Sequence, residues 1–139
     1  MSLELTIVTP EGQAFHGEVE SVVLPGAEGE FGVLAGHEPF LSALQTGGLE
    51  LQTADGKKRL AAVSRGYAEI HGDKVNVMVG TCEWAGEIDT ERAERARQRA
   101  LKALEEARST PDGEAQYQEL REAYSRAVAR ITVSERFKS

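Results

Sequence analysis

Arginines recur at helical spacing near the C-terminal end of the chain. Arg92, Arg95 and Arg99 are three, four and seven residues apart, so one face of a helix would carry all three. Arg126 and Arg130 are four residues apart and would share a face of a second helix. Guanidinium groups bind phosphate oxygens through several planar donors. If the two helices run antiparallel, Arg92 and Arg99 face Arg126 and Arg130 and form a basic pocket for a phosphate-rich ligand.

The same arginines are equally consistent with an ordinary solvated helix face. On such a face they would pair with neighbouring carboxylates, for which the candidates are Glu91, Glu94, Glu119 and Glu122. The sequence alone leaves both interpretations open.

The remaining reactive side chains do not form a catalytic set. His16, His37 and His71 lie among glycines without metal-ligand spacing, which favours turn or interface positions over metal ligation. No serine lies in a nucleophile elbow, and no glycine loop is followed by the Lys and Ser or Thr that cradle phosphates. The single cysteine, Cys82, is expected in the core. We therefore predict neither catalysis by this chain alone nor a metal site.

Two amphipathic helices are expected to position the arginines. Asp89 is a favourable N-cap, and Ile88 and Ala93 stand where a hydrophobic staple would form. Apolar stripes at helical spacing follow, made of Ala93, Ala96, Ala100, Leu101, Ala103, Leu104 and Ala107 and then of Tyr117, Leu120, Ala123, Tyr124, Ala127, Val128 and Ile131. The break at 109–113 predicts an antiparallel hairpin. Because each alanine methyl contributes under ~1 kcal/mol, the hairpin should depend on docking to the sandwich, a ligand or a partner.

The first part of the chain is expected to form short strands. Leu3, Leu5 and Ile7 alternate with Glu4, Thr6 and Val8, which is the period of a half-buried strand. Further short apolar segments lie at 19–24, 31–34, 40–44, 49–53, 58–64, 67–70 and 75–79. Turn residues at 55–56 and 71–74 separate some of them and indicate hairpins. This spacing predicts a small β-sandwich or barrel.

The two regions also differ in composition. Residues 1–88 hold 13 of the 14 glycines, with 5 basic and 13 acidic residues, whereas residues 89–139 hold 11 basic and 10 acidic residues. Such a shift indicates a turn-rich part followed by a helical part. We predict a β-sandwich domain over residues 1–86 and an α-helical hairpin domain over residues 87–139.

The composition of the whole chain excludes several classes of protein. The net charge of −7 disfavours general nucleic-acid binding. No apolar run approaches the ~18 residues that a membrane span needs, and the N-terminal residues show no signal peptide. One cysteine leaves no internal disulfide framework. We expect a soluble, cytosolic-type protein without direct membrane insertion.

One segment carries a specific family resemblance. Residues 23–39, Val-Leu-Pro-Gly-Ala-Glu-Gly-Glu-Phe-Gly-Val-Leu-Ala-Gly-His-Glu-Pro, resemble the signature loop of the epsilon subunit of F-type ATP synthase. Residues 9–12, 65–70 and 88–93 resemble the same family, in the same order along the chain. Ala35 replaces the proline usual in that family before Gly36 and His37, a change expected only to loosen the turn.

The resemblance implies a flattened N-terminal β-sandwich, a C-terminal helical hairpin and a non-catalytic role in the central stalk, or rotor. In that family the sandwich binds the gamma subunit and the c-ring, and so couples ring rotation to the catalytic head during ATP synthesis. The hairpin can extend along gamma into the head, where it meets the alpha and beta subunits, and block ATP hydrolysis. The resemblance places Glu28, Gly29 and Glu30 toward the c-ring and His37 at the gamma interface.

Some bacterial members of the family bind ATP when the hairpin is folded, and the resemblance therefore suggests a regulatory ATP site. The matching positions are Glu83, Asp89, Arg92, Ala93, Arg99, Arg126 and Arg130. In such a site Glu83 and Asp89 would accept hydrogen bonds from the adenine amine or fix an arginine. The arginines would neutralise the phosphates, so no cofactor or metal is expected to be obligatory. Alanine at Arg92 or Arg126 should then weaken ATP binding by more than ~1 kcal/mol.

Two other functions remain as alternatives. One is a free-standing ATP-sensing module, which would lack a strong apolar or acidic docking surface on the sandwich. The other is a scaffold or carbohydrate-type sandwich with a coiled-coil tail, which would need longer heptads than these. The absence of a transit segment favours a bacterial protein, placed peripherally at the cytoplasmic face of the plasma membrane through partner subunits.

Overall fold

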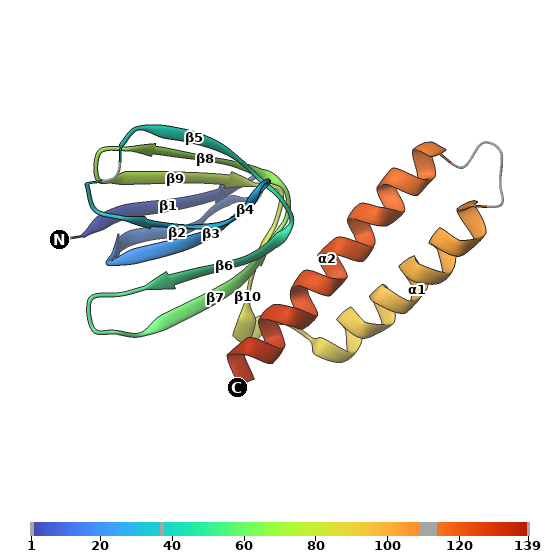
Figure 1. Cartoon of the computed structure of the whole chain (residues 1–139). Coiled ribbons are helices and arrows are strands. Elements are labelled where there is room, and N and C mark those ends of the chain that lie inside the picture. The colour runs from blue at the N-terminus through green and yellow to red at the C-terminus, as the bar shows by residue number, and fades with distance from the viewer. Residues whose placement is uncertain (1, 37, 109–113, 139) are drawn as a thin grey trace.

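The computed structural model describes residues 2–36, 38–108 and 114–138, and these form a β-sandwich followed by two long helices, as predicted (Figure 1). The strands are β1 (Leu3–Thr9), β2 (Gly12–Val19), β3 (Ser21–Gly26), β4 (Gly29–Leu34), β5 (Phe40–Leu44), β6 (Gly47–Gln52), β7 (Lys58–Val63), β8 (Gly66–His71), β9 (Lys74–Val79) and β10 (Cys82–Trp84). A 3₁₀ turn, η1 (Ala85–Glu87), leads into the helices α1 (Thr90–Arg108) and α2 (Glu114–Lys138).

The strands pair in the order β10-β7-β6-β3-β5-β8-β9-β1-β2, with β4 on the other edge of β3. The link between β3 and β5 is a single pair, Gly26 with Leu44. At this point the sheet folds over, so that β10, β7, β6, β3 and β4 form one layer and β5, β8, β9, β1 and β2 form the other (Figure 1). All pairs are antiparallel except β1 with β9.

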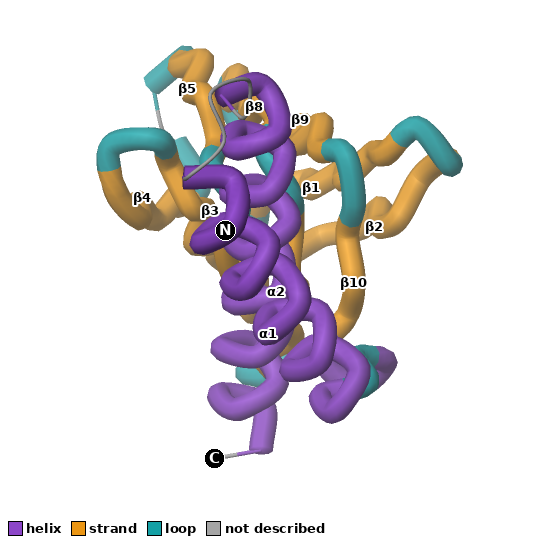
Figure 2. The backbone as a smooth tube through the Cα atoms, turned by 90° about the vertical axis from the view of Figure 1, so that its right-hand side faces the viewer, coloured by secondary structure: helices purple, strands orange, loops and turns teal. Residues whose placement is uncertain are grey.

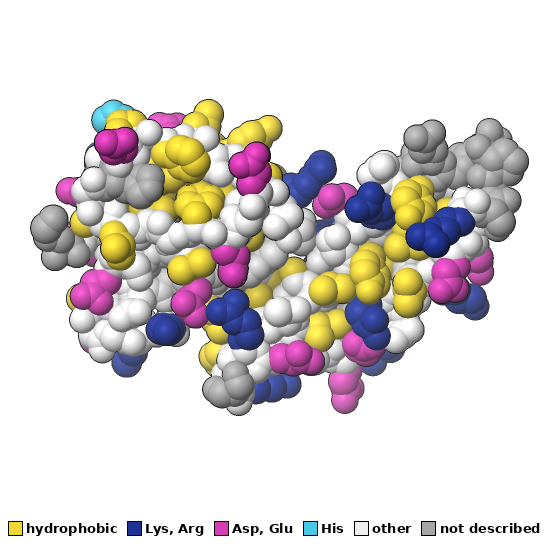
Figure 3. Space-filling model, in the orientation of Figure 1, with side chains coloured by type: hydrophobic (Ala, Val, Ile, Leu, Met, Phe, Trp, Pro, Cys, Tyr) yellow, Lys and Arg dark blue, Asp and Glu magenta, His cyan; other side chains and the backbone are white. Residues whose placement is uncertain are grey.

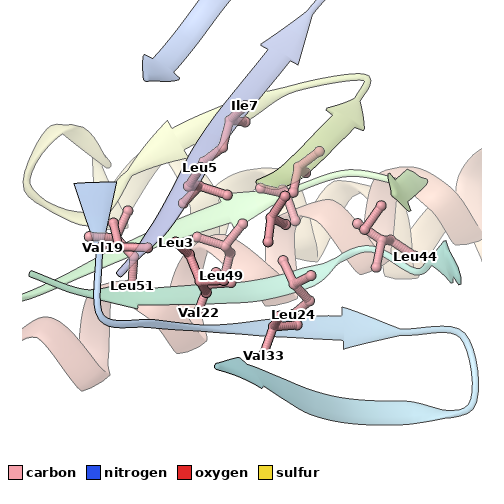
Figure 4. Packing of buried hydrophobic residues seen from close by; sticks show 14 of the residues in the cluster. Leu3, Leu5, Ile7, Val19, Val22, Leu24, Val33, Leu44, Leu49 and Leu51 are labelled. Carbon is pink, nitrogen blue, oxygen red and sulfur yellow. The ribbon is translucent and has the colours of Figure 1, made fainter. Parts of the chain in front are cut away.

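The core fills the space between the two layers. Alternate residues of β1 point inward from one layer, where Leu3, Leu5 and Ile7 are fully buried, and they meet Leu49 and Leu51 of β6 (Figure 4). This is the period of two that the alternating sequence predicted. The described side chains have no buried polar atom without a hydrogen-bond partner.

Two strands were missing from the sequence prediction. Only one residue of β2 is fully buried, and the strand pairs only along β1, so its residues lack an apolar alternation. β10 has three residues, all half-buried, and is too short to show a period. The turns at Asp55–Gly56 and at Gly72 are confirmed, because Gly56 and Gly72 have φ values of +83° and +63° at the ends of their hairpins.

The start of α1 follows the predicted capping. The Asp89 carboxylate accepts a hydrogen bond of 3.1 Å from the backbone N–H of Arg92, which satisfies a donor of the first turn. The break between the helices, predicted over 109–113, lies outside the described residues. The two helices pack against each other, and Ala93 and Ala100 on α1 and Ala127 on α2 are buried.

The second helix docks on the outer face of the sandwich and lies between α1 and the strands (Figures 1 and 2). Its contact is made to β6, β7 and η1 through a small apolar cluster of Ala62, Ala85, Ala129 and Val133, flanked by Leu60 and Ile88. Gly48 of β6 permits the close approach, since an added Cβ there would lie 3.2 Å from Val133 Cγ2. Small residues on both sides thus set the helix-to-sheet distance.

Gly66→Ala is expected to destabilise the sandwich by about 1–3 kcal/mol, the usual cost of overpacking. An added Cβ at Gly66 would lie 1.9 Å from the Met78 carbonyl oxygen, so β8 and β9 would have to separate. The measurement is thermal and urea unfolding of the full chain. Gly32→Ala is the control, because its Cβ would have no neighbour within 4 Å. Equal stabilities of the two variants would contradict the expectation.

Candidate ligand cleft and docking surfaces

A cleft of about 490 Å³ lies where the sandwich meets both helices. Its walls come from β10, η1, the two residues that join η1 to α1, and both helices. They consist of Glu83, Glu87, Ile88, Asp89, Arg92, Ala93, Ala96, Arg99 and Arg130. The lining is mostly polar and combines three guanidinium groups with three carboxylates. Segments that are distant in sequence therefore build one polar cavity.

The helical geometry explains how the arginines reach this cleft. Arg92 and Arg99 are two turns apart on the same face of α1, while Arg130 comes from the C-terminal half of α2. The Arg130 guanidinium donates a 2.6 Å hydrogen bond from Nε to Glu83 Oε1, which holds it at the wall of the cleft. Arg95 is exposed and is not part of the lining.

Six of the seven residues predicted for the ATP site line this cleft: Glu83, Asp89, Arg92, Ala93, Arg99 and Arg130. Arg126 instead lines a small adjoining pocket between α2 and β7, which it shares with Glu83 and Arg130. It lies one turn before Arg130 along α2 and beside Ala62 and Val63. The sequence prediction missed Glu87, whose position in η1 gave no periodic signal.

Two of the carboxylates that could have paired with the cleft arginines have other partners. Glu94 holds Arg97 on α1, with Nη2 to Oε1 at 2.5 Å. Glu122 lies 3.6 Å from Arg65, in the turn between β7 and β8. The acidic groups that do lie in the cleft are Glu83, Glu87 and Asp89, and of these Glu83 faces Arg130 and Asp89 caps α1. Arg92 and Arg99 thus remain next to the cavity as candidate phosphate ligands.

The acidic tip of the signature loop is a tight turn between β3 and β4. Glu28 and Glu30 are exposed there, and Gly29 has a φ of +132°, which favours glycine. Gly26 is also constrained, since an added Cβ would lie 2.6 Å from the Gly29 carbonyl oxygen. His37, predicted at the gamma interface, lies outside the described residues. Just before it, the N–H of Gly36 donates a 3.0 Å hydrogen bond to Asp73 Oδ1.

The sequence prediction missed an apolar row on the outer face of the second layer. Ala43, Tyr67, Met78 and Val8 are consecutive cross-strand neighbours on β5, β8, β9 and β1. Tyr67, Met78 and Val8 are 57%, 46% and 39% exposed, and Leu41 beside the row is 66% exposed. Figure 3 shows hydrophobic side chains gathered on the upper part of the sandwich, where Figure 1 draws β5 and β8.

This row, which we call the apolar row (Val8, Leu41, Ala43, Tyr67 and Met78), departs from the usual polar outer face of an antiparallel sheet. Apolar residues at outward positions were the available signal, but it requires the register of four strands to be known. A contiguous exposed apolar patch of this kind is typical of a surface that binds another protein.

Cys82 does not provide a reactive thiol. It is half-buried against the core, and burial, opposed by Arg59, raises its pKa to about 11. The neutral thiol therefore predominates at neutral pH. The part of the chain that the structure describes contains no group of three or more His, Cys, Asp or Glu able to hold a metal ion. It also contains no helix that is both long and apolar enough to cross a membrane.

Comparison with known proteins identifies matching families for both parts of the chain. The model of the ATP synthase delta/epsilon chain β-sandwich domain matches residues 2–85. The model of the long α-helix domain of the same chain matches residues 87–135. The ATP synthase epsilon chain of Syntrophobacter fumaroxidans is 42% identical over 134 residues, 96% of each chain. That of Nitratidesulfovibrio vulgaris strain Hildenborough is 42% identical over 132 residues, 95% of each chain.

Solved structures show the same likeness. A chain in the mitochondrial ATP synthase of Euglena gracilis, solved with OSCP, F1 and the c-ring, has a TM-score of 0.71 and 31% identity. The match covers 89% of this chain and 76% of that one. A chain from the central stalk and c-ring of the Tetrahymena thermophila enzyme has a TM-score of 0.53 at 11% identity, and this second match supports the fold alone.

Proposed function

Because this chain belongs to the ATP synthase delta/epsilon chain family and is a non-catalytic subunit of that enzyme, we propose that it works in the central stalk. In this role it links the rotating c-ring, through the gamma subunit, to the catalytic head during proton-driven ATP synthesis. The relative from Euglena, solved together with F1 and the c-ring, supports this assignment. The family thus indicates which enzyme complex the chain joins, and the surfaces of the chain indicate which contacts it makes there.

The apolar row is the observation that carries the proposal. The row crosses four strands of the layer that the hairpin does not cover, and it is exposed. Such a surface suits stable binding of another protein, and we propose that this protein is the gamma subunit. The exposed tip with Glu28, Gly29 and Glu30 is assigned to the c-ring, where a basic loop would complement its charge. His37 keeps its expected place at the gamma interface.

Binding to purified gamma subunit tests the stalk assignment. The full chain and gamma, mixed at micromolar concentration, are expected to co-elute in size-exclusion chromatography as a stable complex. A further test adds isolated c-ring in detergent and follows its retention by the complex. Separate elution of the chain and gamma at all concentrations would refute the assignment.

The cleft is proposed as a regulatory ATP site of the folded hairpin. Glu83, Asp89, Arg92, Ala93, Arg99 and Arg130 line it, and Arg126 lines the adjoining pocket, which shares Glu83 and Arg130 with the cleft. A ligand held between β10, α1 and α2 favours the folded arrangement over any other, because it binds only where the three elements meet. ATP acts here as a regulatory ligand and not as an obligatory cofactor.

The proposed inhibition by the hairpin depends on an equilibrium between two forms, one folded on the sandwich and one extended. In the extended form it contacts the alpha and beta subunits of the head and blocks ATP hydrolysis, and ATP in the cleft opposes that form. The small alanine-rich contact between α2 and the sandwich supports a hairpin that can leave the strands. The protein is placed peripherally at the cytoplasmic face of a bacterial plasma membrane, through its partner subunits.

Replacing Arg92 or Arg99 with alanine is expected to weaken ATP binding more than about tenfold, because each removes a charge-assisted hydrogen bond worth roughly 1.5–3 kcal/mol. Arg126→Ala should have a smaller effect, since this residue lies in the adjoining pocket. Titration calorimetry of the full chain with ATP, with and without magnesium, measures these affinities. Arg95→Ala is the matched control, because Arg95 is exposed on the same helix outside the cleft. Unchanged affinity in the Arg92 and Arg99 variants would exclude the proposed pocket.

A free-standing ATP-sensing module remains the second candidate, because the cleft by itself would suit it. Such a module has no need for an exposed apolar row, which favours the stalk assignment. ATP binding combined with no affinity for gamma would support the module instead.

A further inference from the structure

Three ion pairs are spaced along α2 and tie it to three different parts of the sandwich. Glu122 lies 3.6 Å from Arg65 in the β7–β8 turn, and its other oxygen accepts from Thr46 Oγ1 at 3.5 Å. Arg130 lies 2.6 Å from Glu83 of β10. Arg136 lies 3.4 Å from Glu50 of β6. Figure 3 shows blue and magenta side chains along the junction between the sandwich and the hairpin.

The signs of these charges define one docked position. Along α2 the charged residue of the first pair is acidic and those of the second and third pairs are basic. Their partners on the sandwich have the opposite charges, so the first partner is basic and the other two are acidic. Reversing or sliding the helix would bring like charges together or leave charges without their partners. The pairs therefore specify the position of the helix as well as holding it.

The apolar contact between these ties is small. Its buried members are three alanines and one valine, set against a glycine that carries no side chain. Burial of apolar area, the main source of stability in most interfaces, is accordingly limited here. The ion pairs are partly exposed, so salt screens them.

We propose that the three pairs, Arg65–Glu122, Glu83–Arg130 and Glu50–Arg136, form an electrostatic latch that sets how often the hairpin leaves the sandwich. The docked fraction then falls as ionic strength rises. This latch is a property of the chain itself and does not depend on ATP or on any partner subunit. Its test therefore succeeds or fails independently of the proposed function.

The alkylation rate of a thiol on the buried face of α2 directly measures how often the hairpin leaves the sandwich. In a Cys82→Ala background, Ala129→Cys puts the only thiol at a site that is 7% exposed in the docked state. Reaction with a maleimide, slow compared with opening, reports the undocked fraction even when that fraction is small. Rates are normalised to those of a free cysteine peptide at each salt concentration.

Neutralising one pair by Arg65→Gln or by Glu122→Gln is expected to raise the alkylation rate about two- to fivefold at low salt. The exchanged pair, Arg65→Glu with Glu122→Arg, should restore the slow rate. Raising the salt from about 0.05 to about 0.5 M should raise the parent rate and shrink the effect of either variant. Glu94→Gln is the control, since its partner Arg97 lies on the same helix, α1.

Three outcomes would overturn the latch. The rate at position 129 could be insensitive to both salt and neutralisation, so that the apolar contact alone holds the hairpin. The exchanged pair could fail to restore protection, which would mean that charge pairing is not the cause. Finally, Ala61→Cys, a second reporter in the sandwich core at 0% exposure, could accelerate equally, which would mean that the variants unfold the whole chain.

Discussion

Met78→Glu is expected to lower the affinity of this chain for its proposed partner, the gamma subunit, by more than about 100-fold, because it introduces a charge at the centre of the proposed interface. Met78 lies in the middle of the apolar row, paired with Tyr67 on one side and Val8 on the other. Binding would bury the new carboxylate among apolar side chains with no partner, which is costly. The free chain should stay folded, because Met78 is 46% exposed and points away from the core.

Co-elution with gamma and surface plasmon resonance measure this effect. Leu34→Glu is the matched control, since Leu34 is an equally apolar residue, 65% exposed, but lies on β4 in the other layer. Thermal unfolding of both variants verifies that the sandwich is intact. Equal loss of binding in the two variants would mean that net charge, and not the apolar row, controls the association.

The sequence predicted the architecture well because the signals involved are local. The alternation of Leu3, Leu5 and Ile7 requires no knowledge of neighbouring strands, and neither does the N-cap at Asp89. The missed strands, β2 and β10, are defined by pairing with β1 and β7, which lies beyond any local pattern. Whether such exposed or very short segments form strands is determined by pairing with a neighbouring strand and not by their own sequence pattern.

The candidate sites show the same division. Helical spacing placed Arg92 and Arg99 on one face, and the antiparallel hairpin then brought Arg130 to the same cleft. Spacing could not decide that Arg126, one turn earlier on α2, faces β7, because this depends on how the helix is rotated against the sandwich. The apolar row could not be predicted either, because Tyr67 and Met78 become neighbours only through the register of β8 and β9.

Val133→Asp is expected to release the hairpin and with it to abolish the ligand cleft. Val133 is a residue of α2 on the face that packs against the sandwich, and it is 1% exposed. It lies against Gly48 of β6 and belongs with Ala129 to the small apolar cluster. A carboxylate at that position loses its water when the helix docks, at a cost of several kcal/mol. The apolar contact that it replaces is too small to offset such a cost.

Release of the hairpin should be visible in two ways. Trypsin should cleave after the arginines of α1 and α2 faster than in the parent chain, and ATP affinity should fall more than about tenfold because the cleft needs β10, α1 and α2 together. Gln116→Asp provides the control, since Gln116 is exposed on the same helix and is not a member of the three latch pairs. The two variants differ mainly in burial, so a difference in proteolysis reports docking even if ATP does not bind. Identical proteolysis of both variants would show that the Val133 contact does not hold the hairpin, and the latch pairs would then have to supply the whole attachment.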